Sequence, residues 1–207
     1  MYAFALLAAP PPAYVGPGLA GGRVMFWTAG RVLAAVQPDL DLTMLAEETT
    51  ALEAVVDHDR VIQELFALAP VLPLRFATVF SSADALSEHL LAHQDLYLAR
   101  LDQLQDRVEF TLRLTPVVLA PTVANAAEGR AYFQQRKQQY QQVQDRQQQQ
   151  RAEQEHLFTH LQTLGVHYVL EGERVHLLVP RALGVFLIPL THWEVTLTGP
   201  LPPYHFV

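Results

Sequence analysis

In the first half of the chain, apolar residues follow two spacings, one typical of strands and one typical of helices. Runs of consecutive or alternating apolar residues, which predict strands, lie at residues 2–7, 23–27, 31–36, 71–80 and 108–114. Apolar residues that recur every three or four positions, which predict amphipathic helices, lie at residues 51–68 and 83–106. We expect strands and helices in this order to form a ferredoxin-like α+β domain.

The second half of the chain begins with a long helical segment. Residues 129–164 contain no proline, and no glycine after Gly129, so the sequence predicts a helix of about 36 residues, roughly 54 Å long. Its ends are apolar and its middle is rich in glutamine, without the heptad repeat of a coiled coil. A hairpin at 166–170 and 175–179, a short helix at 181–190 and a strand at 193–197 are predicted to follow. We expect a second small α+β domain, made of a long helix and a small antiparallel sheet.

The distribution of charge places the domain boundary. Residues 1–115 hold 7 Arg and 14 acidic residues, a net charge of −7, whereas residues 116–207 hold 6 Arg, 1 Lys and 7 acidic residues, a net charge of 0. A charge-free run from 115 to 127 contains Pro116 and Pro121, as a linker or strand exit does. We therefore expect an N-terminal domain over 1–116 and a C-terminal domain over 117–207.

Composition excludes several classes of protein. The chain has no cysteine, which excludes a disulfide scaffold, Cys-ligated zinc and thiol catalysis. Its net charge of −7 argues against nucleic acid as a partner, because nucleic-acid binding needs a basic stripe. Prolines and glycines interrupt the uncharged first 22 residues, and no basic residue precedes the short apolar run at 4–9. We therefore expect no membrane span, no signal peptide and a cytoplasmic location.

A glycine-rich segment, Gly-Pro-Gly-Leu-Ala-Gly at residues 16–21, has the spacing of a dinucleotide-binding loop. That mechanism needs a helix to begin at the loop, so that its amides hold the pyrophosphate. A strand pattern follows instead, from Arg23. We interpret the segment as a loop between two strands and expect no cofactor.

Two histidine pairs, His89/His93 and His156/His160, have the i, i+4 spacing that can ligate a metal on one helix face. A catalytic zinc needs a third protein ligand, and neither pair forms the H-E-x-x-H motif. We therefore expect no metal site at either pair.

Clustered carboxylates could in principle perform acid–base chemistry, and they occur at Glu47/Glu48 and at Asp57/Asp59 around His58. Acidic residues also favour helix N-termini, which is the simpler interpretation here. The chain contains no G-x-S-x-G nucleophile elbow. We expect a protein without catalytic residues, which is not an enzyme.

Arg75 stands inside the strongly apolar run from 71 to 80. A cation there is costly unless it is paired or reaches solvent. One interpretation is an arginine that extends to the sheet edge or pairs with an acid such as Glu109. The other is a contact with a partner protein.

The C-terminal residues 199–207 are rich in proline and aromatic side chains. Pro200, Pro202 and Pro203 favour an extended backbone with few amide donors. Because the segment is apolar rather than polar, we expect it to pack back onto the protein or to dock on a partner.

Four separated motifs resemble those of one family. Residues 71–80, Val-Leu-Pro-Leu-Arg-Phe-Ala-Thr-Val-Phe, resemble the VLPLRFGTVF signature of the gas vesicle GvpL/GvpF family. Residues 129–133 resemble its GRxYL helix start, residues 199–206 its closing GPWPPYxF, and residues 1–7 its first strand. Two positions depart from the pattern: Ala77 stands for the usual Gly and Leu201 for the usual Trp. The methyl group at 77 suggests looser backbone contact, and the lost indole at 201 a different docking energy for the tail.

The resemblance implies a non-enzymatic, minor gas vesicle protein with two α+β domains. Its implied partners are the main shell protein, GvpA, and other accessory gas vesicle proteins. Its implied role is to prevent aggregation of GvpA and to assist nucleation and assembly, or to be a minor structural component of the gas vesicle wall. The residues that we expect to contact the partner are Arg75, Phe76, Pro200, Pro202, Pro203 and Tyr204.

Two other classes stay open from the sequence alone. One is a small metal- or nucleotide-dependent enzyme, which bound metal at His89 or His156 would support. The other is an RNA-binding ferredoxin-like domain, against which the acidity of the chain counts.

Overall fold

The computed structural model describes residues 1–13, 16–43, 48–118, 129–183 and 188–207, and it divides into two compact units. The first unit comprises Met1–Glu109, Pro180–Ala182 and Pro200–Val207. The second comprises Phe110–Val179 and Leu183–Gly199. The sequence predicted two units that are each continuous along the chain, with a boundary between residues 116 and 117. In the structure, the C-terminal residues Pro200–Val207 belong instead to the first unit.

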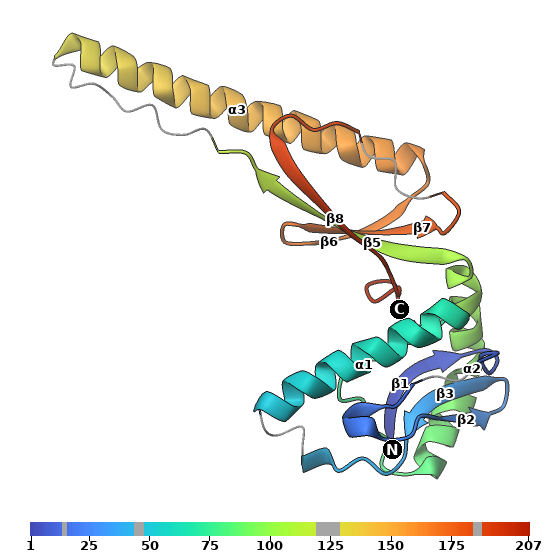
Figure 1. Cartoon of the computed structure of the whole chain (residues 1–207). Helices are drawn as coiled ribbons and strands as arrows, with labels where there is room; N and C mark the ends of the chain where they lie inside the picture. Colours follow the sequence, from blue (N-terminus) through green and yellow to red (C-terminus); the bar gives the residue numbers. More distant parts are fainter. Residues whose placement is uncertain (14–15, 44–47, 119–128, 184–187) are drawn as a thin grey trace. The chain divides into compact units, whose positions relative to one another are not determined.

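The first unit is built on a four-stranded antiparallel sheet in the order β2-β3-β1-β4 (Figure 1). Its strands are β1 (Tyr2–Leu7), β2 (Met25–Ala29), β3 (Val32–Gln37) and β4 (Leu72–Pro73). Every residue of β1 and β3 is buried, as is typical of central strands covered on both faces.

Two helices, α1 (Glu48–Leu68) and α2 (Ala83–Leu104), supply this cover. On one face, Tyr2 and Phe4 share a core cluster with Ile62 of α1. On the other, the Trp27 indole N–H donates to Ser87 Oγ of α2 at 2.9 Å. The expected class, α+β in two small units, is confirmed. The first sheet has the ferredoxin-like strand order, but the described residues of the connection from β1 to β2 form the 3-10 turn η1 (Leu19–Gly21) and no α-helix, and α2 follows β4.

The prediction of a strand over residues 71–80 is wrong for most of that range. Only Leu72 and Pro73 pair with β1 as a strand, and a turn follows at Phe76 and Ala77. Ala77 has a positive φ of 62°, which no regular strand accommodates. Part of the predicted pairing with β1 is nevertheless present, because Val79 forms an isolated antiparallel bridge with Tyr2.

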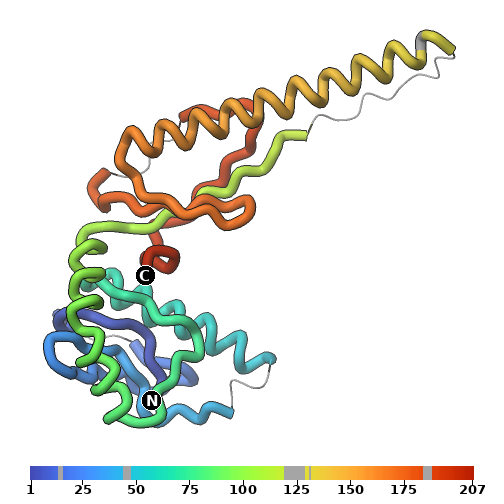
Figure 2. Tube along the Cα trace, turned by 180° about the vertical axis from the view of Figure 1, so that it is seen from behind, coloured from blue at the N-terminus to red at the C-terminus, as the bar shows by residue number. Residues whose placement is uncertain are grey.

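The second unit holds a sheet in the order β6-β7-β5-β8 and one long helix, which can be followed along the chain in Figure 2. The elements are β5 (Arg107–Pro116), α3 (Arg130–Thr163), β6 (His167–Glu171), β7 (Arg174–Pro180) and β8 (Trp193–Leu201). The predicted long helix, hairpin and last strand are confirmed. Residues 181–183 form a turn, and the centre of the short helix predicted at 181–190 lies outside the described residues.

The core of the second unit forms where α3 meets the sheet. Leu157 and Leu161 of α3 are buried, as are Val175, Leu177 and Val179 of β7. Phe158 of α3 stacks on Tyr168 of β6 at a ring-centroid distance of 5.3 Å. Within the described ranges, no helix is both long and apolar enough to cross a membrane.

Candidate partner-binding site

A loop over residues 74–80 leaves the edge strand β4 and runs back along β1 in the first unit. Leu74 N–H donates to Phe4 O at 2.9 Å, Ala3 N–H to Thr78 O at 3.0 Å, and Phe80 N–H to Met1 O at 2.8 Å. The loop is therefore attached at both ends, and residues 75–77 form its tip.

The tip rests on His58 of α1 and Tyr2 of β1. His58 Nε2 lies 3.0 Å from Leu74 O and Nδ1 lies 2.8 Å from the Tyr2 hydroxyl. Because a carbonyl only accepts, Nε2–H donates to Leu74, and Nδ1 accepts from Tyr2. The Tyr2 oxygen in turn accepts the Ala77 N–H at 3.3 Å. One buried network thus fixes the backbone on both sides of Arg75.

Burial keeps both members of this network neutral. Burial lowers the pKa of His58, outweighing the opposite effects of its hydrogen bond to Leu74 and of the Asp59 charge. Burial raises the pKa of Tyr2 to about 12, against a smaller lowering by the Ala77 N–H. A neutral histidine and a protonated tyrosine are the forms that the network requires, so its geometry is stable at neutral pH.

Arg75 and Phe76 lie at the tip but point to different surroundings. Phe76 is half-buried, with ring centroids 6.4 Å from Tyr2 and 5.7 Å from His58. Arg75 is exposed, and its side chain makes no hydrogen bond or ion pair with any described residue. The pairing with Glu109 is therefore not made. The backbone of Arg75 is therefore held in place, and its exposed guanidinium presents five donors to solvent.

The C-terminal tail packs onto the same unit. Pro202 and Pro203 are buried, whereas Pro200, near the end of β8, is exposed. Tyr204 is half-buried against the core of the first unit, and its hydroxyl donates to Asp59 Oδ1 of α1. Burial and the hydrogen bond to Asp59 raise the pKa of Tyr204 well above its ordinary value.

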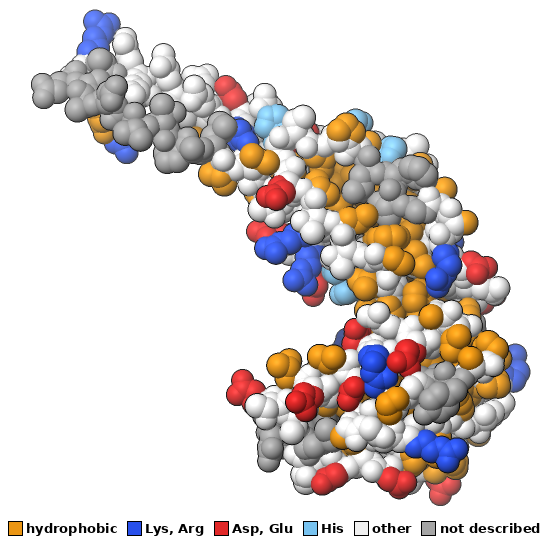
Figure 3. Space-filling view, viewed as in Figure 1, with side chains coloured by type: hydrophobic (Ala, Val, Ile, Leu, Met, Phe, Trp, Pro, Cys, Tyr) orange, Lys and Arg blue, Asp and Glu red, His pale blue; other side chains and the backbone are white. Residues whose placement is uncertain are grey.

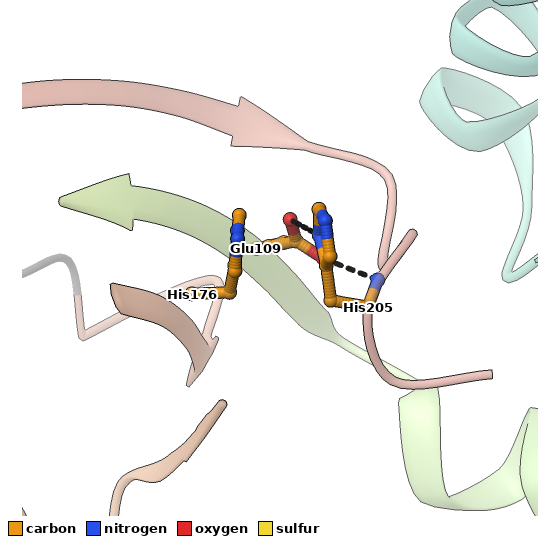
Figure 4. A group of neighbouring side chains, drawn as sticks. All are labelled: Glu109, His176 and His205. Carbon is orange, nitrogen blue, oxygen red and sulfur yellow. Dashed lines mark hydrogen bonds and ion pairs between the residues drawn. The ribbon is translucent and has the colours of Figure 1, made fainter. Parts of the chain in front are cut away.

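A buried carboxylate completes the attachment of the tail. Glu109 has no exposed surface, and Figure 4 shows its carboxylate beside His205. The His205 backbone N–H donates to Glu109 Oε2 at 2.9 Å, and the His205 ring Nδ1 lies 2.6 Å from Oε1. A buried carboxylate is costly without partners, so these contacts favour the docked tail.

Helix α1 connects the loop and the tail. His58 holds the loop, and the next residue, Asp59, binds Tyr204. Phe76 and Tyr204 both pack against the core cluster that contains Tyr2, Phe4 and Ile62. Four of the six residues expected to contact a partner therefore pack against the first unit: Phe76, Pro202, Pro203 and Tyr204. The other two, Arg75 and Pro200, are exposed.

The glycine-rich loop is occupied by the protein's own side chains. Gly16 N–H donates to Glu64 Oε2 at 2.7 Å, and Leu19 N–H donates to Gln37 Oε1 at 2.9 Å. Gln37 Nε2 returns a bond to Leu19 O at 3.1 Å. A Cβ on Gly18 would come within 2.3 Å of Gln37 Oε1, so glycine is needed there for close packing. A carboxylate on a loop amide would also repel a phosphate, which supports the interpretation as a connection between strands.

The His89/His93 pair makes local contacts in the part of the chain that is described. His89 Nε2 lies 2.7 Å from the Tyr97 hydroxyl, and His93 Nδ1 lies 2.9 Å from His89 O. Burial, followed by the nearby His93, lowers the pKa of His89. No third His, Cys, Asp or Glu ligand atom joins either helical pair among the described residues.

The acidic clusters are also engaged. Asp57 accepts from Arg60 at 3.0 Å, and Asp59 accepts from Tyr204 and from Gln63 Nε2, the latter at 2.8 Å. Glu47 lies outside the described residues. These carboxylates therefore stabilise α1 and hold the tail.

Sequence reasoning missed two residues of this site, Tyr2 and Glu109. The only signal for Tyr2 was a polar group at the start of an apolar run. Glu109 was expected on the polar face of its strand, yet it is fully buried. His58 could be found from the sequence, because it shares the helical spacing of Val61, Ile62 and Leu65. It is the one polar side chain on that buried face of α1.

The fold and the site define a class: a two-unit α+β protein whose central polar groups hold a loop and a tail in place. The family model described as "Gas vesicle synthesis protein GvpL/GvpF" matches residues 1–207. The chain belongs to this family, and it is a gas vesicle-associated protein of a structural and assembly family rather than of a known enzyme family.

Solved structures agree with this assignment. The crystal structure of the gas vesicle protein GvpF from Anabaena sp. PCC7120 is similar with a TM-score of 0.67 at 12% identity, over 99% of this chain and 94% of that one. The crystal structure of gas vesicle protein GvpF from Microcystis aeruginosa is similar with a TM-score of 0.65 at 13% identity, over 99% and 97% of the two chains. At these identities the likeness establishes the fold. No curated protein matched the chain.

Proposed function

We propose that this protein binds the main gas vesicle shell protein, GvpA, keeps it from aggregating before assembly, and so assists nucleation and growth of the vesicle. The observation that carries the proposal is the loop over residues 74–80. It presents the exposed Arg75 on a backbone fixed by His58 and Tyr2. Because this backbone is already held, binding through Arg75 costs less conformational freedom than binding through a flexible loop would.

The physical argument starts from the partner. A subunit that faces a gas-filled interior presents apolar surface, and before assembly this surface and its strand edges promote aggregation. The guanidinium of Arg75 can bind a carboxylate or backbone carbonyls at such an edge. Residues 1–115, with 7 Arg against 14 acidic residues, give a covered complex the charge that keeps it in solution. Other accessory gas vesicle proteins are further candidate partners.

Aggregation of purified GvpA, followed by light scattering, tests this function. Wild-type protein is expected to delay aggregation in proportion to its concentration, and Arg75→Gln to lose most of the delay. The matched control is Arg100→Gln, which removes an exposed arginine from α2. Equal delay by wild type and Arg75→Gln would remove the loop from the proposal, and no delay by either would refute the chaperone role.

A second experiment separates a chaperone from a minor component of the wall. Tagged protein is recovered from cells that co-express GvpA, and finished vesicles are washed and assayed for it. Recovery with soluble GvpA and absence from washed vesicles supports an assembly chaperone. Retention on washed vesicles supports a wall component, and recovery in neither fraction contradicts both roles.

A further inference from the structure

The N-terminal half of α3 carries a surface that the other described residues of the second unit leave exposed. The hydrogen bonds of α3 with other described segments begin at Arg146, which donates to Val117 O at 2.6 Å. They continue at Gln150, whose carbonyl accepts from the Trp193 indole at 3.1 Å, and at the buried Leu157 and Leu161. The described side chains before residue 146 are exposed or half-exposed.

This half of the helix has one aromatic and basic face. The α3 face consists of Tyr132, Phe133, Arg136, Tyr140 and Val143, which fall within an arc of about 100° at 3.6 residues per turn. Its four apolar members are 42%, 73%, 66% and 54% exposed. Between Arg130 and Arg146 the helix carries three Arg and one Lys against one Asp, a net charge of +3. Exposed aromatic residues next to arginine are typical of the centres of protein interfaces.

Helix α1 of the first unit carries a face of opposite charge. The α1 face consists of Glu48, Leu52, Val55, Val56 and Asp59, again within about 100° of arc. Leu52, Val55 and Val56 are 68%, 42% and 64% exposed. In Figure 3, hydrophobic side chains lie beside acidic ones over α1. The helix holds five acidic residues and one Arg, a net charge of −4 with His neutral.

We propose that the α3 face of one chain docks on the α1 face of a second copy of the same chain. The charges are complementary, both faces expose apolar side chains, and Tyr132–Val143 and Glu48–Asp59 each span about 16 Å at 1.5 Å per residue. The contact joins two different surfaces, so each copy can bind one neighbour through α1 and another through α3. Such a heterologous contact builds head-to-tail arrays, or a ring if the rotation closes. A helix-on-helix contact of this length is small, so association depends on concentration.

Sedimentation of the full-length protein over a concentration series tests the proposal. At low salt, the weight-average mass is expected to rise above the 23.2 kDa of one chain. It should fall back toward one chain in about 0.5 M salt, where screening acts over only about 4 Å. Lys137 and Glu53 lie directly beside these two faces. Arg136→Glu with Lys137→Glu, and separately Glu48→Lys with Glu53→Lys, reverse the charge on and beside the α3 face and the α1 face, and should each weaken association about tenfold or more.

Mixing gives the decisive result. The two double variants carry complementary reversed faces, so an equimolar mixture should recover association although neither variant associates alone. Arg23→Glu with Arg100→Glu makes the same change in net charge as the Arg136/Lys137 variant, at exposed sites elsewhere, and should associate like wild type. Phe133→Ser with Tyr140→Ser, which leaves the charge unchanged, should also weaken association.

Three outcomes would overturn the proposal. The first is a wild-type protein that stays monomeric at all concentrations. The second is equal loss in the Arg23/Arg100 control. The third is failure of the mixture to recover association while circular dichroism shows both variants folded. None of these depends on GvpA, so the self-association and the proposed function can fail independently.

Discussion

At the scale of single residues, the tip of the loop over residues 74–80 combines a strained backbone with a satisfied network. Ala77 has a φ of 62°, in the left-handed region where a Cβ costs roughly 1–2 kcal/mol. The family signature that residues 71–80 resemble has glycine at this position. The positive φ explains this preference, because glycine adopts such a backbone conformation without strain. The hydrogen bond from Ala77 N–H to Tyr2 holds the residue there.

Replacement of Ala77 by glycine should therefore stabilise the first unit by about 0.5–1 kcal/mol, because relief of the strained φ outweighs the entropy that glycine loses on folding. Urea unfolding, followed by Trp27 fluorescence in a Trp193→Phe background, measures this unit alone. The matched control is Ala99→Gly, at an exposed position inside α2, which should destabilise by about 0.5–1 kcal/mol. A loss of stability in Ala77→Gly would contradict the left-handed backbone.

His58 should make the first unit sensitive to acid. Its pKa is lowered by folding, so below the ordinary value of about 6.5 the unfolded chain binds a proton that the folded chain resists. The stability that it contributes is fully present above that value and is lost as the pH falls toward the folded pKa. His58→Gln should be less stable at pH 7.5 but should lose less stability between pH 7.5 and 5, measured by urea unfolding at each pH. Parallel pH profiles for the two proteins would refute the role of His58.

The residue scale is also where sequence reasoning reached its limit. The lone cation in an apolar run drew attention to Arg75, and the structure leaves its side chain exposed. The partner of His58, however, is 56 residues away in the chain, and helical spacing carries no information about such a contact. Burial of Glu109 was missed for the same reason, because its partner, His205, lies in the tail.

At the scale of elements, periodicity predicted the long regular segments well. The helices α1, α2 and α3 begin and end within a few residues of the predicted limits, because each has a sustained spacing and few glycines or prolines. The failure was at 71–80, where composition favoured a strand but Ala77 adopts a positive φ. A β-forming composition describes how side chains pack on a pleated surface, and it does not specify a bulging loop.

One element-scale prediction concerns the attachment of residues 191–193 to α3. Glu153 accepts from Thr191 N–H at 3.1 Å and from His192 N–H at 2.9 Å. Burial is the largest single effect on Glu153 and raises its pKa, but the hydrogen bonds from Thr191 and His192 together outweigh it and lower the pKa to about 2. A lowered pKa stabilises the folded state above the ordinary value, and this contribution is lost as the pH falls toward 2.

Glu153→Gln should accordingly destabilise the second unit by on the order of 1 kcal/mol at pH 7, and by less at pH 3. Trp193 fluorescence in a Trp27→Phe background reports on this unit. Glu155→Gln, at an exposed position on the same helix, is the control and should change little. Equal effects of the two substitutions would show that the hydrogen bonds from Thr191 and His192 contribute nothing.

At the scale of the whole molecule, the main surprise is that the last residues of the chain belong to the first unit. The sequence predicted that the apolar tail either packs back onto the protein or docks on a partner, and in the structure it packs onto the first unit. It could not indicate where the tail packs, because Asp59 and Glu109 look like ordinary surface acids in the sequence. The two-unit organisation follows from local patterns, whereas this long-range return of the chain does not.

Deletion of residues 202–207 should therefore destabilise the first unit, although the deleted residues lie at the opposite end of the sequence. Loss of His205 leaves the buried Glu109 carboxylate without this partner, at a cost of roughly 3 kcal/mol. Trp27 fluorescence should report the loss, while the Trp193 transition changes less. Deletion of Val207 alone, which is exposed, is the control and should cost no more than about 0.5 kcal/mol.

The docked tail also affects the order in which the protein matures on the ribosome. N-terminal segments fold first during synthesis, yet the first unit acquires its contacts with Tyr204 and His205 only after nearly all later residues have been translated. A nascent or prematurely terminated chain therefore carries a first unit that is loosened at Glu109 and Asp59. Chains that end before Tyr204 should therefore be cleaved faster by an added protease than the finished protein, because proteolysis follows the population of opened states.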